Sequence, residues 1–118
     1  MSALSWLAVF VGGCVGAPAR YLLDAVVRRW VAGPFPAGTL LVNVLGSLVL
    51  GAAAAGLDGS AYALVGTGFC GALTTFSTFT FETWRLGESG RLELALLNVG
   101  VSLVAGVLAA ALGWWLVA

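Results

Sequence analysis

A chain of 118 residues that is 61% hydrophobic and only 8% charged lacks the surface of a soluble domain, which usually carries about a quarter of its residues as charges. Its five basic and five acidic side chains cancel to a formal net charge of zero, so no nucleic-acid partner is expected. The absence of histidine, together with the absence of acids from the centres of the apolar runs, leaves little for a proton relay to use.

The charged residues separate four uncharged runs, at 1–19, 30–57, 59–81 and 94–118. Each run is close to or longer than the roughly 20 residues that cross the hydrocarbon core as a helix. We therefore expect transmembrane helices at about 4–28, 37–57, 61–85 and 92–117, with 1–118 forming one transmembrane domain. The start of the chain has no basic residues ahead of its apolar run, so we expect the first helix to remain in the mature protein. The expected fold class is all-α. We expect a multi-pass protein of the cell (plasma or inner) membrane, in contact with the lipid bilayer.

The first predicted helix carries a small-residue face and one deep charge. Gly12 and Gly16 are four apart, a spacing that lets another helix approach closely. Arg20 lies one turn before Asp24, and two interpretations stay open. Arg20 either pairs with Asp24 while its head reaches toward water, or it places a positive charge at a pore mouth where it concentrates anions.

Two of the predicted helices carry a stripe of polar side chains at i+4 spacing. On the second helix the stripe is Thr39, Asn43 and Ser47, and on the fourth it is Asn98, Ser102 and Gly106. A single asparagine in a membrane span is as often there to form a hydrogen bond between helices as to serve a function. Two such stripes favour a lined path across the membrane.

The third predicted helix should be broken. Three glycines precede a run of hydroxyl residues, and both glycine and clustered threonine weaken a helix. A break near residues 71–75 would free backbone carbonyls, which the bilayer tolerates only where another group takes them up. Phe76 and Phe79 are spaced i+3 within the hydroxyl run. Ordinary packing explains most such pairs, but rings alternating with hydroxyls can also present their partially positive edges to an anion.

Three strings carry a family resemblance, and together they extend over the first three helices. They are Gly13-x-x-Gly16-Ala17-x-x-Arg20-Tyr21, Gly38-Thr39-Leu40-x-x-Asn43-x-x-Gly46-Ser47 and Gly68-Phe69-Cys70-Gly71-x-x-Thr74-Thr75-Phe76-Ser77-Thr78-Phe79. The sequence resembles the Fluc-type fluoride channels, also called the CrcB family, and the match continues into the fourth helix. The resemblance implies a passive fluoride-selective channel built as an antiparallel (dual-topology) dimer of four-helix subunits with two pores. It also implies the function of lowering cytoplasmic fluoride.

The resemblance assigns roles to individual residues. Phe76 and Phe79 match rings whose edges face the ion, and Asn43 matches a pore-lining asparagine. The polar track would include Ser77, Thr78, Ser102 and Thr39, with Arg20 near the vestibule. Gly71 and Thr74 match positions whose backbone carbonyls, from both subunits, hold a structural sodium ion at the dimer interface. This chain departs from some members at Asn98, where a tyrosine can occur, and at Gly106, where a serine can.

The arginines indicate a preferred orientation. Arg28, Arg29, Arg85 and Arg91 all lie by the first and third loops, which the positive-inside rule puts in the cytoplasm, with both termini outside. An antiparallel homodimer needs a chain that inserts both ways. The partner is therefore either a second copy or an oppositely oriented paralogue.

Two other functions compete with the channel. A small four-helix proton-coupled multidrug or cation exporter needs an embedded acid, and all five acids read as loop or near-terminal positions. A membrane scaffold would use the polar stripes only to hold helices together. An enzyme is not expected, because the sequence offers no nucleophile–base pair or metal cluster.

Overall fold

The computed structural model describes residues 2–118 and shows four membrane-length helical spans. The first, second and fourth spans are single helices, and the third is built from four short helical pieces. The elements are α1 (Ala3–Trp30), α2 (Ala37–Gly56), α3 (Gly59–Tyr62), the π-helix η1 (Ala63–Cys70), α4 (Gly71–Leu73), α5 (Ser77–Glu88) and α6 (Leu92–Val117). No strand occurs between residues 2 and 118, so the all-α fold class and the four spans are confirmed.

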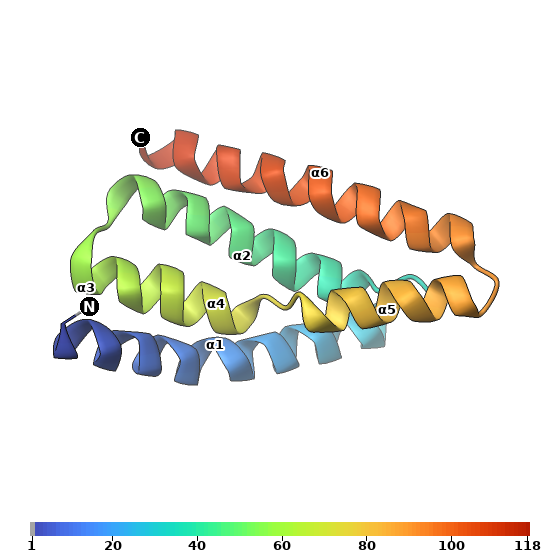
Figure 1. Ribbon diagram of the computed structural model, residues 1–118, viewed down its shortest axis with the longest axis horizontal. Coiled ribbons are helices and arrows are strands. Elements are labelled where there is room, and N and C mark those ends of the chain that lie inside the picture. The colour runs from blue at the N-terminus through green and yellow to red at the C-terminus, as the bar shows by residue number, and fades with distance from the viewer. Residues whose placement is uncertain (1) are drawn as a thin grey trace.

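The spans lie side by side as a bundle, with α6 packed along α2 and α1 packed along the third span (Figure 1). The bundle measures 48 Å along its long axis, which matches the roughly 40–45 Å of a bilayer with its headgroups. Most large apolar side chains, including Trp6, Phe10 and Leu108, are exposed on the outside of the single chain. That arrangement suits hydrocarbon surroundings and would be unfavourable in water.

Glycine brings the helices close together. A Cβ at Gly12 would overlap the carbonyl oxygen of Leu64, and a Cβ at Gly16 would overlap that of Phe69. Both glycines therefore let α1 press directly on the backbone of the third span, as their spacing predicts.

The third span departs from a regular helix in two places. Its first half contains the π-helix η1, between α3 and α4, which the sequence did not predict. The chain then leaves helical geometry over residues 74–76, within and just beyond the expected range of 71–75. Thr74 is extended, with φ −84° and ψ 162°. The predicted break in helix three is confirmed, and Figure 1 shows it as a bend between α4 and α5.

Two helix ends lie beyond their predicted limits. The first helix continues to Trp30, and α5 continues three residues past Arg85 to Glu88. Leu86 explains the second extension, because it is the one residue of α5 that is buried. Ser89 then ends the helix, since both its N–H and its hydroxyl donate to the carbonyl of Arg85.

All four loop arginines gather at one end of the bundle. Arg28 and Arg29 occupy the last turn of α1, Arg85 lies near the end of α5, and Arg91 precedes α6. Both chain termini lie at the opposite end (Figure 1). The arginines are therefore distributed asymmetrically along the axis that crosses the membrane, although four of the five acids lie toward the same end.

Candidate functional site

The break in the third span opens a cavity of about 620 Å³ between α2, the third span and α6. Two of the sequence-predicted sets meet there, the ring pair and the polar stripes. The predicted site residues on its wall are Asn43, Gly71, Thr74, Phe76, Phe79 and Ser102. None of the described residues that line it is charged. The cavity is therefore a neutral, partly polar chamber at membrane depth.

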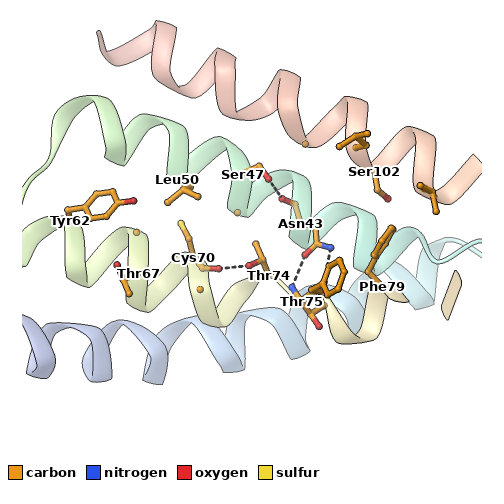
Figure 2. A pocket seen from close by; sticks show the side chains of 17 residues that line it. Asn43, Ser47, Leu50, Tyr62, Thr67, Cys70, Thr74, Thr75, Phe79 and Ser102 are labelled. Carbon is orange, nitrogen blue, oxygen red and sulfur yellow. Dashed lines mark hydrogen bonds between the residues drawn. The ribbon is translucent and has the colours of Figure 1, made fainter. Parts of the chain in front are cut away.

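Asn43 fastens the break to α2. Its Nδ2 donates to the carbonyl oxygen of Thr75 at 3.0 Å, and its Oδ1 accepts from the N–H of Thr75 at 2.8 Å (Figure 2). One side chain thus satisfies both backbone groups of a residue that no helix contains. The sequence left open whether Asn43 lines a path or joins two spans; the structure shows it joining α2 to the third span and lining the cavity, and its role in a path stays a prediction. Its second amide hydrogen remains to serve another acceptor.

Phe76 and Phe79 flank the end of the break. Their ring centroids are 6.1 Å apart and their planes are inclined at 39°. Both rings line the cavity, and Phe76 is 79% exposed in the single chain. Ring edges carry the positive part of the aromatic quadrupole, so tilted rings beside a neutral cavity can stabilise an anion.

Three of the six hydroxyl groups that line the cavity donate their hydrogens within the chain. Ser47 bonds the carbonyl of Asn43 at 2.7 Å, and Thr74 bonds that of Cys70 at 2.8 Å (Figure 2). Ser102 donates to Oδ1 of Asn98 at 3.3 Å. An ion that takes a hydrogen bond from one of these groups must displace an internal acceptor. Weak, exchangeable donors of this kind suit transit better than tight binding.

A second, smaller cavity of about 250 Å³ lies on the α1 side of the break. Its wall includes Arg20, Asp24, Thr39, Thr75 and Thr78, so it joins three predicted site residues from three different spans. Ser77 lines neither cavity and is exposed, with its hydroxyl 3.5 Å from that of Thr75. The predicted site is thus divided into a charged compartment and a neutral one.

The ion-pair interpretation of Arg20 is wrong. Asp24 pairs with Arg28 instead, with Nε and Oδ2 2.9 Å apart. Within residues 2–118, Arg20 makes no salt bridge. Both arginines lie four residues from Asp24, and an acid that precedes its base at i,i+4, as Asp24 precedes Arg28, is the more favourable arrangement on a helix. The guanidinium of Arg20 is left free to face the smaller cavity.

Asn98 does not line the neutral cavity, which corrects the predicted stripe on the fourth span. Ser102 and Gly106 do line it. Asn98 is 1% exposed and points its amide at Thr83 of α5, with Nδ2 2.9 Å from Oγ1. The side chain of Asn98 is short, so it reaches the hydroxyl of Thr83 only by turning away from the cavity.

Thr75 is the residue that the sequence interpretation undervalued. It is 9% exposed, lines both cavities, and its Oγ1 accepts the N–H of Thr78 at 3.1 Å. Its side chain therefore caps the start of α5. The signal was present in the Thr74-Thr75 pair, since β-branched threonine disfavours the helix and its oxygen readily caps the next one.

Gly71 and Thr74 are among the residues whose carbonyl oxygens lose their helical donors at the break. The N–H of Thr75, which would serve Gly71 in a helix, bonds Asn43. The N–H of Thr78, which would serve Thr74, bonds the side chain of Thr75. These are the two carbonyls that the family resemblance assigned to sodium, and oxygen atoms freed in this way are suitable ligands for it. The role itself stays a prediction.

Comparison with known proteins identifies the family. Residues 7–114 match the family described as CrcB-like protein, Camphor Resistance (CrcB). This chain belongs to the CrcB family. It is 47% identical over 112 residues to "Fluoride-specific ion channel FluC 2" of Mycobacterium tuberculosis strain H37Rv, covering 94% of this chain and 89% of that relative.

Two further relatives extend the comparison. "Fluoride-specific ion channel FluC 1" of Nocardia farcinica is 51% identical over 100 residues, which cover 84% of this chain and 70% of the relative. "Fluoride-specific ion channel FluC" of Hydrogenovibrio crunogenus is 40% identical over 120 residues, covering 95% and 89%. The resemblance drawn from the motifs is therefore confirmed, and the CrcB chain described here is a multi-pass membrane protein.

Proposed function

We propose that this CrcB chain forms a fluoride-selective channel that passively releases cytoplasmic fluoride. The observation that carries the proposal is the neutral cavity at the broken third span, where Asn43, Phe76, Phe79 and Ser102 share one wall. Its relatives of 40–51% identity are named as fluoride-specific ion channels.

The chemistry of the cavity suits fluoride. Fluoride is small and strongly hydrated, so a narrow path must replace its water with close donors. Amide hydrogens, hydroxyls and ring edges supply them without full charges that would trap the ion. An inside-negative membrane potential then favours exit by about 2.3 kcal/mol per 100 mV.

The smaller cavity serves as the vestibule. Arg20, free of Asp24, raises the local concentration of anions there, and Thr39 and Thr78 line the same space. Ser77 and Thr78 follow the break directly, so their hydroxyls continue the polar track between the two cavities.

A second chain must cover the neutral cavity. Thr67, Gly71 and Phe76 are exposed along its open side, and the bilayer has no water to satisfy exposed hydroxyls and freed carbonyls. We infer an antiparallel dimer in which each chain closes the cavity of the other.

The same interface would hold a structural sodium ion. The carbonyl oxygens of Gly71 and Thr74 have lost their helical donors, and Gly71 has open space around its Cα. Two oxygens from each chain give a hard cation the oxygen ligands it prefers. The ion would be coordinated by carbonyl oxygens that otherwise have no hydrogen-bond donor at membrane depth.

The uneven placement of the arginines suggests the partner's identity. Four arginines at one end favour a fixed orientation, with that end in the cytoplasm. A fixed chain finds an antiparallel partner in an oppositely oriented paralogue, whereas an unbiased one pairs with itself. Relatives numbered FluC 1 and FluC 2 are consistent with paralogous pairs.

A proton-coupled exporter is the alternative that the experiment must exclude. Liposomes loaded with potassium fluoride and containing the purified chain, with or without its paralogue, are diluted into fluoride-free buffer with valinomycin. A channel releases fluoride at equal pH on both sides, and at a rate that an imposed pH gradient leaves unchanged. Release that requires a pH gradient, or transport of a cationic dye in place of fluoride, supports the exporter.

A further inference from the structure

Asn98 is the least exposed polar side chain among residues 2–118, at 1%. It lines neither cavity, and its amide makes two side-chain bonds. Nδ2 donates to Thr83 of α5 at 2.9 Å, and Oδ1 accepts from Ser102 of α6 at 3.3 Å. A buried amide in a membrane span is expensive unless paired, so this one is committed to joining α6 to α5.

The bonds of Asn98 lead to one of the two rings. Thr83 donates its own hydroxyl hydrogen to the carbonyl oxygen of Phe79 at 2.8 Å. Thr83 can therefore only accept from Asn98, which turns Nδ2 toward Thr83 and leaves Oδ1 for Ser102. Three donated bonds thus run in a fixed direction from Ser102 through Asn98 and Thr83 to the backbone of Phe79.

Packing holds that turn of α5 only weakly. From Ser77 to Thr83 no residue is buried, and the one buried residue of the helix, Leu86, lies two turns after Phe79. One other side-chain bond reaches the turn from outside α5, from the hydroxyl of Thr39 on α2 to the carboxylate of Glu82. The orientation of the Phe79 ring therefore depends on these polar bonds to α6 and α2 more than on packing.

We propose that Asn98 is a positioning residue for Phe79, acting through Thr83 to fix the ring-bearing turn of α5 against α6. The inference rests on the proposed fluoride channel. It gives Asn98, which the sequence analysis had expected on the wall of the path, a role in holding a ring that lines the cavity. Asn98 does not touch the ion. It sets how closely the ring edge approaches the cavity that the ion crosses.

The test compares fluoride release by Thr83→Val, Thr83→Ser and Asn98→Leu in the full-length protein in liposomes. Valine keeps the shape of threonine without its hydroxyl, while serine keeps the hydroxyl. We expect Thr83→Val and Asn98→Leu each to slow fluoride release by about tenfold, and Thr83→Ser to restore it to within about twofold of the wild type. A variant that combines Thr83→Val with Asn98→Leu should release fluoride no more slowly than the slower of the two single variants. The reason is that each substitution breaks the same hydrogen bond between Asn98 and Thr83.

A matched control is Ser89→Ala, which removes the same kind of hydroxyl-to-carbonyl bond at the far end of α5. It should release fluoride at the wild-type rate. The midpoint of thermal unfolding is measured for every variant, because a purely structural role would lower midpoint and flux together.

The outcomes separate the two claims. A wild-type chain that carries no fluoride overturns the proposed function and this inference with it. A conducting wild type whose Thr83→Val variant conducts equally well overturns the inference alone. So does a Thr83→Ser variant as slow as Thr83→Val, or a loss of flux that only follows a loss of stability.

Discussion

The amide of Asn43 bonds both backbone groups of Thr75, its Nδ2 3.0 Å from the carbonyl oxygen and its Oδ1 2.8 Å from the backbone nitrogen. This single residue on α2 supplies the hydrogen bonds that Thr75 lacks because the third span is broken there. It satisfies a backbone that would otherwise lie unpaired at membrane depth, and it still faces the neutral cavity.

Replacing Asn43 with aspartate should therefore impair both the break and the path. Aspartate still accepts from the N–H of Thr75, but it cannot donate to the carbonyl, and it brings a negative charge to a cavity meant for an anion. We expect a loss of about 1–3 kcal/mol of stability from the unpaired carbonyl. Fluoride release, measured with an electrode, should fall by more than about tenfold.

The matched control for Asn43 is Ser47→Ala, one turn further along α2. Ser47 also lines the cavity, but its hydroxyl donates to the carbonyl of Asn43 in its own helix, so alanine removes a cavity hydroxyl and leaves the break untouched. Its thermal unfolding should match the wild type, and a Ser47→Ala variant as destabilised as Asn43→Asp would show that the bonds to Thr75 are not what holds the break.

Isoleucine at either ring position should block transport without unfolding the protein. Phe76→Ile and Phe79→Ile keep apolar bulk but remove the ring edge that, in the proposed channel, faces the ion. Fluoride release should fall by about tenfold or more in each, with unchanged thermal unfolding. Phe10→Ile on the outer face of α1, where the side chain is 69% exposed, is the control and should conduct normally. Normal flux through both ring variants would contradict the assigned role.

Adding a serine at Gly106 should be tolerated. A Cβ there would lie 3.6 Å from Oγ of Ser47, an ordinary contact, and the new hydroxyl would join the cavity wall. We expect wild-type stability and fluoride release at least equal to that of the wild type. Gly113→Ser on the same helix should behave oppositely, because its Cβ would overlap the carbonyl oxygen of Leu48.

The close approach of α1 to the third span gives a stability prediction. Gly12→Ala places a methyl group into the backbone of Leu64 and should destabilise the protein by about 1–3 kcal/mol. Neighbouring Gly13→Ala should be nearly neutral, because its Cβ would meet only Ala72, at 4.0 Å. Thermal unfolding in detergent compares the two, and equal midpoints would contradict the packing.

Much of this site could be predicted from the sequence. The four spans followed from uncharged runs of membrane length, and the break followed from glycines and threonines that weaken a helix. The contacts of Asn98 and Arg20 were harder to predict, because they depend on how the side chains are arranged in the folded chain. Spacing alone cannot show that Asn98 turns toward Thr83, or that Arg28 takes Asp24 away from Arg20. The π-helix also needed coordinates, since its wider turns leave no signature in hydropathy.

The orientation of the chain can be tested by cysteine labelling. With Cys14 and Cys70 changed to alanine, a single cysteine at Ala118 or at Ser89 reports opposite ends of the bundle. A membrane-impermeant maleimide applied to whole cells should label Ala118→Cys and spare Ser89→Cys, because the arginine end is expected in the cytoplasm. Equal labelling of both positions would indicate dual insertion and a homodimer.

The most direct test of the central claim is halide selectivity in liposomes that contain the protein and equal concentrations of fluoride and chloride. Neutral donors around the broken third span should pass fluoride rapidly while chloride, too large for the same close shell, stays inside. Fluoride release without chloride release is the expected result. Equal release of both ions, or retention of both by a correctly folded assembly, would contradict the account.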